Sequence, residues 1–249
     1  MNLKIFNSFQ EKLDVLVEGD LQSDKTVVFV HGFGTNKNEG TDLFVDISRE
    51  IGTDYKIVRF DFSGYGNSEG KQEEVNYEKQ TYDLESVLDH VRNQFQGEIF
   101  IIAHSMGTFI TSLLSPEGIK KAVFTGIPQQ EPKEVYNTIK SRILKKADGV
   151  FNERGISRYL RSSGEVQKIG AKFWKILLTI KPIELFEAFA QKTDLILFKP
   201  IQDHVTAGGS FDKYRNSRIL NWVELNGDHN FSKPQDRVVL INKIKDFLS

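Results

Sequence analysis

The chain has 249 residues, of which 39% are hydrophobic and 11% aromatic, enough for one sizeable core. Its 33 Lys and Arg residues nearly balance its 34 Asp and Glu residues, so no overall field would attract nucleic acid or an anionic membrane. The absence of cysteine excludes disulfides, thiolate catalysis and cysteine-ligated zinc. The first residues lack the apolar run of a signal peptide, and no stretch is as long and apolar as a membrane span. We therefore expect a cytoplasmic protein without stable membrane insertion.

Apolar segments of two kinds alternate along the chain. The first stretch, residues 3–17, has the alternation of an antiparallel hairpin. Short β-branched runs then predict strands at residues 26–30, 55–60, 98–103, 121–125, 194–198 and 222–225. Apolar residues spaced three and four apart predict helices at residues 43–51, 84–91, 109–114 and 238–247. This alternation predicts an α/β fold, a mainly parallel twisted sheet of about eight strands with helices on both faces.

One segment, residues 128–192, interrupts the alternation. It shows no convincing strand, and its apolar spacing predicts helices. It carries 13 Lys or Arg residues against 7 Asp or Glu residues, which we interpret as a solvated basic face. We therefore expect a core domain formed by residues 1–127 and 193–249, with residues 128–192 inserted between two late strands as a helical cap, or lid.

The pentapeptide Ala103-His104-Ser105-Met106-Gly107 ends one predicted strand and begins a helix. A serine in such a sharp turn projects its hydroxyl above the sheet, and small residues on either side leave room for the neighbouring backbone. The helix that follows points its amide groups toward developing negative charge. The pentapeptide resembles the Gly-x-Ser-x-Gly nucleophile elbow of the α/β-hydrolase superfamily, with Ala103 in place of the first glycine. The resemblance implies that Ser105 is the nucleophile.

Two further loops extend the resemblance. After the strand at 26–30 comes His31-Gly32-Phe33-Gly34, similar to the loop that supplies one oxyanion-hole amide in this family. The resemblance assigns that amide to Phe33 and the second one to Met106, and we expect His31 to brace the loop. After the strand at 55–60, residues 61–70 resemble the family's Asp-x-x-Gly-x-Gly-x-Ser loop. We interpret Asp61 and Ser68 as hydrogen-bonding residues that fix it.

The remaining triad members are expected in the family order of serine, acid, histidine. Of the five histidines, His229 follows the last predicted strand, where a base would reach a serine across the sheet top. Asp203 follows the strand at 194–198 and matches the family's position for the acid that orients the imidazole. Asp228 adjoins the histidine too closely to orient its ring, and Asp194 begins a strand at the wrong end of the sheet.

The sequence argues against several other kinds of site. A dinucleotide-binding loop would require a third glycine at the position that Lys37 occupies. No phosphate-binding Gly-Lys-Ser/Thr loop and no His-Glu-x-x-His metal helix is present, so we expect no cofactor and no metal. A haloalkane-type hydrolase would carry a carboxylate where Ser105 stands.

The combination of loops looks closest to monoglyceride lipases and cinnamoyl or feruloyl esterases. This resemblance implies a serine carboxylic-ester hydrolase that acts through an acyl-enzyme on a small or medium acyl ester. The expected partner is a small-molecule ester, no nucleic acid is expected, and a homodimer is compatible with the sequence. Alternatives on the same scaffold are a small-molecule receptor, a thioesterase, a perhydrolase and an aminopeptidase. Aminopeptidases commonly hold the substrate ammonium with acidic cap groups, whereas this cap is basic.

Overall fold

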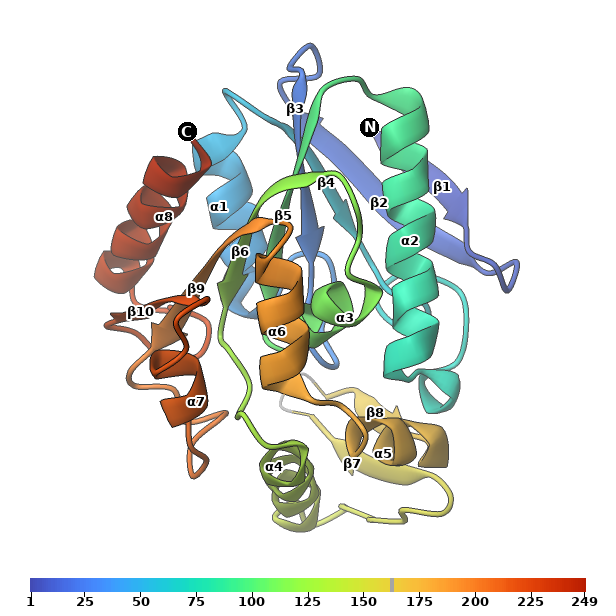
Figure 1. Ribbon diagram of the computed structural model, residues 1–249. Coiled ribbons are helices and arrows are strands. Elements are labelled where there is room, and N and C mark those ends of the chain that lie inside the picture. The colour runs from blue at the N-terminus through green and yellow to red at the C-terminus, as the bar shows by residue number, and fades with distance from the viewer. Residues whose placement is uncertain (162–163) are drawn as a thin grey trace.

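An eight-stranded sheet forms the centre of the protein in the computed structural model, which describes residues 1–161 and 164–249 (Figure 1). In spatial order the strands are β1 (Asn2–Phe6), β2 (Lys12–Gly19), β4 (Lys56–Phe60), β3 (Lys25–Val30), β5 (Glu98–His104), β6 (Ile119–Thr125), β9 (Asp194–Pro200) and β10 (Asn221–Leu225). β2 pairs antiparallel with β1 and β4, and the other neighbours pair parallel. The predicted N-terminal hairpin and mainly parallel sheet are thus confirmed.

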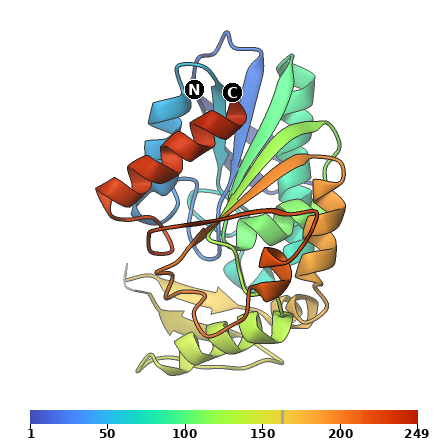
Figure 2. The ribbon, with the colours of Figure 1, turned by 60° about the vertical axis from the view of Figure 1, so that its left-hand side comes forward.

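Helices cover both faces of the sheet (Figures 1 and 2). On one face lie α2 (Tyr77–Gln94), α3 (Met106–Leu114) and α6 (Pro182–Ala190), and on the other α1 (Leu43–Ile51) and α8 (Pro234–Leu248). Along β3, Val28 and Val30 pack in the core beneath α2 and α3, whereas Val27 and Phe29 pack in the core beneath α1 and α8. Because strand side chains alternate between faces, this double burial explains the nearly continuous apolar character of the strand.

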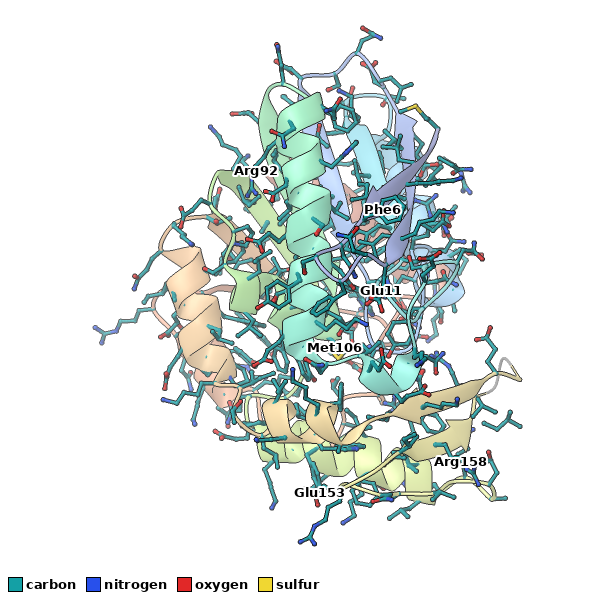
Figure 3. The ribbon with its side chains drawn as sticks, turned by 90° about the vertical axis from the view of Figure 1, so that its right-hand side faces the viewer. Phe6, Glu11, Arg92, Met106, Glu153 and Arg158 are labelled. Carbon is teal, nitrogen blue, oxygen red and sulfur yellow. The ribbon has the colours of Figure 1, made fainter. Side chains whose placement is uncertain are left out.

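The cap, meaning the segment from α4 to α5, enters between β6 and β9. It contains α4 (Pro132–Leu144), β7 (Ser157–Leu160), β8 (Val166–Ile169) and α5 (Ala171–Leu177). It lies beyond the carboxyl ends of the parallel strands, at the bottom of Figures 1 and 2. Figure 3 shows Met106 where the core meets the cap, and Glu153 and Arg158 within the cap. The cap therefore covers the edge of the sheet at which Ser105 stands.

The inserted segment differs from the expectation of a purely helical cap. β7 and β8 pair as an antiparallel hairpin, with buried and exposed residues alternating over only four positions in each strand. Runs this short give too few positions for the period of two to stand out in the sequence. In addition, α6 packs through Phe186 and Phe189 on Phe124 of β6. This helix was expected to be part of the insertion, but it belongs to the layer of helices on the sheet.

The remaining short elements are α7 (Asp212–Arg215) and two 3-10 helices, Gly40–Asp42 and Gln72–Glu74. Within the part of the chain that the structure describes, none of the helices has the length and apolar character needed to cross a membrane.

Candidate active site

Ser105 stands in the turn between β5 and α3. Its backbone φ of 52° and ψ of −123° are unusual for a residue with a side chain, and strain of this kind persists where the surroundings enforce it. The Ser105 amide donates to the carbonyl of Thr125 on β6 at 2.9 Å, which holds the turn against the sheet. A Cβ at Gly107 would lie 2.3 Å from the carbonyl oxygen of Val30, so only glycine fits there. The strained turn thus lifts the hydroxyl above the sheet.

The structure brings Ser105, His229 and Asp203 together. The Nε2 atom of His229 lies 3.1 Å from Oγ of Ser105, and its Nδ1 atom lies 2.9 Å from Oδ2 of Asp203. The three side chains come from three separate connections, after β5, β9 and β10, whose carboxyl ends meet at one edge of the sheet. When Nδ1 donates to the carboxylate, Nε2 is left to accept the hydroxyl proton. This is the arrangement of a nucleophile, a base and an orienting acid.

The carboxylate of Asp203 is buried and accepts several hydrogen bonds. Oδ1 accepts the amides of Val205 and Thr206, while Oδ2 also accepts the hydroxyl of Thr206 and the ammonium of Lys199. Burial alone would raise the pKa of Asp203, but the hydrogen bond and charge of His229, the charge of Lys199 and the Thr206 amide outweigh it and hold that pKa well below its usual range. The group therefore stays a carboxylate that orients the imidazole.

Two other histidines support the site without touching the serine hydroxyl. His104 is fully buried, its Nδ1 lies 2.8 Å from the hydroxyl of Thr125, and its ring packs edge-on against His229 with centroids 4.7 Å apart. Burial lowers the pKa of His104 well below its ordinary value, so the ring is neutral. His31 accepts the amide of Phe62 at Nε2 and lies 2.9 Å through Nδ1 from the carbonyl of Gly32. The predicted bracing role of His31 is confirmed.

The loop after β3 passes directly beside Ser105. A Cβ at Gly32 would lie 3.0 Å from the Ser105 Cβ. Among the residues that the structure describes, the amides of Phe33 and Met106 donate no hydrogen bond, although both residues border the same cavity as Ser105. Two unpaired amides next to a nucleophile are available to a developing oxyanion.

Glu39 holds this loop from behind. Its carboxylate is buried, with Oε2 accepting the amide of Gly32 at 2.6 Å and Oε1 that of Gly40 at 2.8 Å. Burial raises the pKa of Glu39, and the two amide hydrogen bonds and the charge of His229 oppose that rise. Glu39 itself has a φ of 60°, a strained value for a residue with a side chain. Glu39 thus holds the backbone at Gly32, the residue before Phe33.

The loop after β4 is fixed as expected from the sequence. Asp61 accepts the amides of Lys37 and Asn67 and the ammonium of Lys37. The hydroxyl of Ser68 donates to the carbonyl of Asp61 and accepts the amide of Asp14. Both residues thus brace the loop, as predicted.

A narrow cavity of about 50 Å³ opens at Ser105 under α4. Its walls are mostly apolar and come from the core and the cap, with these residues forming them: Phe33, Tyr77, Met106, Phe109, Pro128, Gln129, Val135, Thr138, Ile139, Arg142, Val205 and Thr206. Binding sites for small molecules usually measure about 300–1,000 Å³. The cavity at Ser105 is therefore smaller than the sites that usually hold a small molecule. Among the described residues, no three His, Cys, Asp or Glu side chains gather as a metal site.

Four residues at the site were not predicted from the sequence: Glu39, Lys199, Thr206 and Arg142. Glu39 and Arg142 lie in charged stretches that resemble solvated loop and helix surface, and only the tertiary structure buries them. For Lys199 and Thr206 a signal existed, because both lie within four residues of Asp203 and any polar group so near a buried carboxylate is a candidate partner.

Comparisons with known proteins agree with this architecture. Residues 22–168 match the hydrolase family described as serine aminopeptidase, S33. A sequence match links 53% of this chain to 45% of the palmitoyl-protein thioesterase ABHD10, mitochondrial, of Bos taurus at 26% identity, so it spans less than half of that relative. Est1E from Butyrivibrio proteoclasticus with bound ferulic acid has a TM-score of 0.77 at 16% identity, covering 99% of this chain and 97% of that one.

The esterase domain of a Rhodothermus marinus protein has a TM-score of 0.72 at 20% identity, covering 99% and 96% of the two chains. At such identities the structural likeness shows the fold. The family match extends over more than half of the chain, from the loop of Phe33 through Ser105 into the cap. The chain therefore belongs to the serine aminopeptidase S33 family of α/β-hydrolases.

Proposed function

We propose that this protein hydrolyses carboxylic esters of small or medium acyl groups through an acyl-enzyme on Ser105. One observation carries the proposal, the continuous hydrogen-bonded series from the Ser105 hydroxyl through His229 to Asp203. Two unpaired amides beside the serine and an apolar cavity above it support the same chemistry.

In the first half of the proposed reaction, Nε2 of His229 takes the proton of Ser105 as its oxygen attacks the ester carbonyl carbon. The carbonyl oxygen becomes an oxyanion that the amides of Phe33 and Met106 stabilise. The C–O bond to the alcohol then breaks, and the imidazolium returns its proton to the departing oxygen. An acyl-enzyme and a free alcohol result.

In the second half, a water molecule gives its proton to His229 and its oxygen attacks the acyl carbon. The tetrahedral intermediate collapses with release of the Ser105 oxygen, which takes the proton back. In both halves Asp203 keeps the imidazole in one tautomer and stabilises the charged imidazolium. The low pKa of Asp203 keeps its carboxyl group ionised for this role.

A thioester is the second candidate substrate, because the relative from Bos taurus is named a palmitoyl-protein thioesterase. The same residues would serve, with a thiol in place of the alcohol. An amide substrate with a free amino terminus is less favoured, because the cap that covers the site, residues 132–177, contains 11 basic and 4 acidic residues. Parallel assays of matched oxyesters, thioesters and aminoacyl anilides separate the three.

Turnover of a series of 4-nitrophenyl acyl esters tests the proposal. We expect steady multiple turnover by the wild type and a loss of at least about 10³-fold in kcat for Ser105→Ala. Ser112→Ala is the matched control, because it removes another buried hydroxyl from the same region, on α3. A single turnover by the wild type would instead indicate a receptor on the hydrolase scaffold, and equal rates for wild type and Ser105→Ala would contradict the proposal.

A further inference from the structure

Arg142, near the end of α4, borders two neighbouring cavities. The inner one is the cavity at Ser105, and the outer one is a groove of about 500 Å³ between α4 and the segment 204–208 that follows Asp203. Thr138 and Val205 also border both spaces. A molecule that extends from the outer groove to Ser105 therefore passes the guanidinium group.

The charge of Arg142 has no partner within the described part of the chain. The side chain is half-buried, forms no ion pair, and donates only one long hydrogen bond, of 3.4 Å, to the carbonyl of Val205. In contrast, Arg59 and Arg237, which are more deeply buried than Arg142, pair with Glu18 and Asp46. A guanidinium has five N–H donors, and that of Arg142 donates only this one hydrogen bond among the described residues.

The acidic residue of the outer groove does not supply the missing partner. Glu134 directs its carboxylate at the amide of Ser210 and forms no ion pair with Arg142 among the described contacts. The other titratable groups on the groove wall are Lys145 and His204, which add no negative charge. The groove around the guanidinium is thus suited to an anion.

Two apolar residues lie on the same face of α4. Val135 and Ile139 precede Arg142 by seven and three residues, and all three border the inner cavity. The helix therefore presents hydrocarbon near one end of the cavity and a cation at the other. A ligand that matches this face has an apolar portion and a separate negative group.

We propose that Arg142 is an anion-binding subsite, and that the preferred substrates are esters that carry a second, free carboxylate. The planar guanidinium matches a carboxylate with two parallel hydrogen bonds, which an ammonium group does not provide. This inference rests on the proposed ester hydrolysis and adds a substrate class to it. The carboxylate belongs either to the acyl group or to the leaving alcohol, and two pairs of esters distinguish these.

The first pair is mono-4-nitrophenyl glutarate and its neutral methyl ester, and the second is 4-acetoxybenzoate and its neutral methyl ester. The quantity to compare is the ratio of kcat/KM for the anionic member to that for the neutral member. We expect Arg142→Met to lower this ratio by about tenfold or more in one pair, and Arg142→Lys to restore part of it. A fall in the first pair places the anion on the acyl side, and a fall in the second places it on the alcohol side.

Lys146→Met is the matched control, since it removes an exposed cation four residues farther along from a position outside both cavities. We expect it to leave both ratios within about twofold, because exposed charges are strongly screened. The inference is overturned if Arg142→Met changes neither ratio, or if Lys146→Met lowers them equally, since the effect would then belong to the general charge of the cap.

A binding measurement separates failure of this inference from failure of the proposed function. Calorimetric titration of monomethyl glutarate and 4-hydroxybenzoate into Ser105→Ala requires no turnover. Binding of either compound that weakens by about tenfold in Ser105→Ala/Arg142→Met supports the subsite, even if no ester is hydrolysed. Absence of binding by both compounds overturns the subsite, even if neutral esters are hydrolysed.

Discussion

The ammonium group of Lys199 lies 3.1 Å from the same Asp203 oxygen that accepts the hydrogen bond of His229. Lys199 also donates to the hydroxyl of Thr206 and lies over the ring of Phe211, 4.0 Å from its centroid. Burial lowers the pKa of Lys199, and the adjacent carboxylate opposes that effect. The orienting acid is therefore shared between an imidazole and a fixed cation.

Lys199→Met should move the acid limb of the pH profile of kcat/KM to higher pH, by about one unit. The fixed cation disfavours a second positive charge on the imidazole, so its removal makes the protonated, inactive base easier to form. Lys56→Met is a suitable control, because Lys56 is equally buried at 7% exposure but begins β4 at the opposite end of the sheet. If the rate falls at every pH and the acid limb stays at the same pH, Lys199 contributes packing and its charge does not act on the imidazole.

Much of this site follows from family motifs and strand order together. Ser105, Asp203 and His229 were predicted from the resemblance to the nucleophile elbow and to the family's triad order, and from the position of each after an apolar strand, because parallel strands end at one edge of the sheet. Lys199 was missed because it lies just beyond the apolar run at residues 195–198, where a lysine is ordinarily solvated. Its burial depends on Phe211, which comes from a loop that no local pattern places.

The cap was the least predictable part of the fold. α4 was expected from its apolar spacing, but β7 and β8 contain only four residues each. The basic residues of the segment were interpreted together as a solvated face. Of these basic residues, only Arg142 borders the cavity at Ser105. Its place there depends on the position of α4 over the sheet, which a count of charges does not reveal.

Glu39→Ala should lower kcat by about tenfold or more, with a much smaller change in KM. The Gly32 amide would lose its buried acceptor, and the Phe33 amide, which in the proposed mechanism serves the transition state rather than the bound ester, would lose its fixed direction. Steady-state kinetics with 4-nitrophenyl butyrate measure the effect. The binding of a trifluoromethyl ketone inhibitor, whose adduct with the serine mimics the tetrahedral intermediate, should weaken by a similar factor. Glu69→Ala, which also removes an acceptor of a backbone amide but far from the serine, should leave kcat unchanged. Equal effects of both variants would contradict this role of Glu39.

Ile139→Ala should shift the preferred acyl length of 4-nitrophenyl esters upward by about two to three carbon atoms, because the side chain that it shortens narrows the cavity at Ser105. Ile143→Ala removes the same atoms one turn further along α4, where the side chain is fully buried outside that cavity. It should lower the free energy of unfolding by about 2–4 kcal/mol without moving the length preference. If Ile139→Ala leaves the preferred acyl length unchanged, the acyl group does not bind in the cavity beside Ile139.

Acid should destabilise the fold below about pH 6.5, through buried neutral histidine. Burial lowers the pKa of His31 from 6.5 to about 4, although the charge of Asp61 and the hydrogen bond to the Gly32 carbonyl oppose that change. Between pH 6.5 and about 4, the imidazole of His31 is protonated in the unfolded chain but neutral in the folded chain. The free energy of unfolding therefore falls as the pH falls, by on the order of 3 kcal/mol for this residue.

Urea unfolding at pH 7, 6, 5 and 4.5 measures that dependence. We expect His31→Gln to flatten the slope of the unfolding free energy against pH, and His90→Gln, on the partly exposed side of α2, to leave it as in the wild type. Identical slopes for wild type and His31→Gln would show that the proton uptake occurs at other groups.

In the proposed mechanism, His229 activates Ser105 for attack on an acyl carbon. A 4-nitrophenyl phosphonate ester tests this activation, because its reaction releases one equivalent of nitrophenolate at a measurable rate and labels the protein at a residue that peptide mass spectrometry locates. We expect a single label on Ser105, none in Ser105→Ala, and a rate lower by at least about 10³-fold in His229→Ala. Labelling of Ser105 at the wild-type rate in His229→Ala, or a label on another residue, would contradict this mechanism.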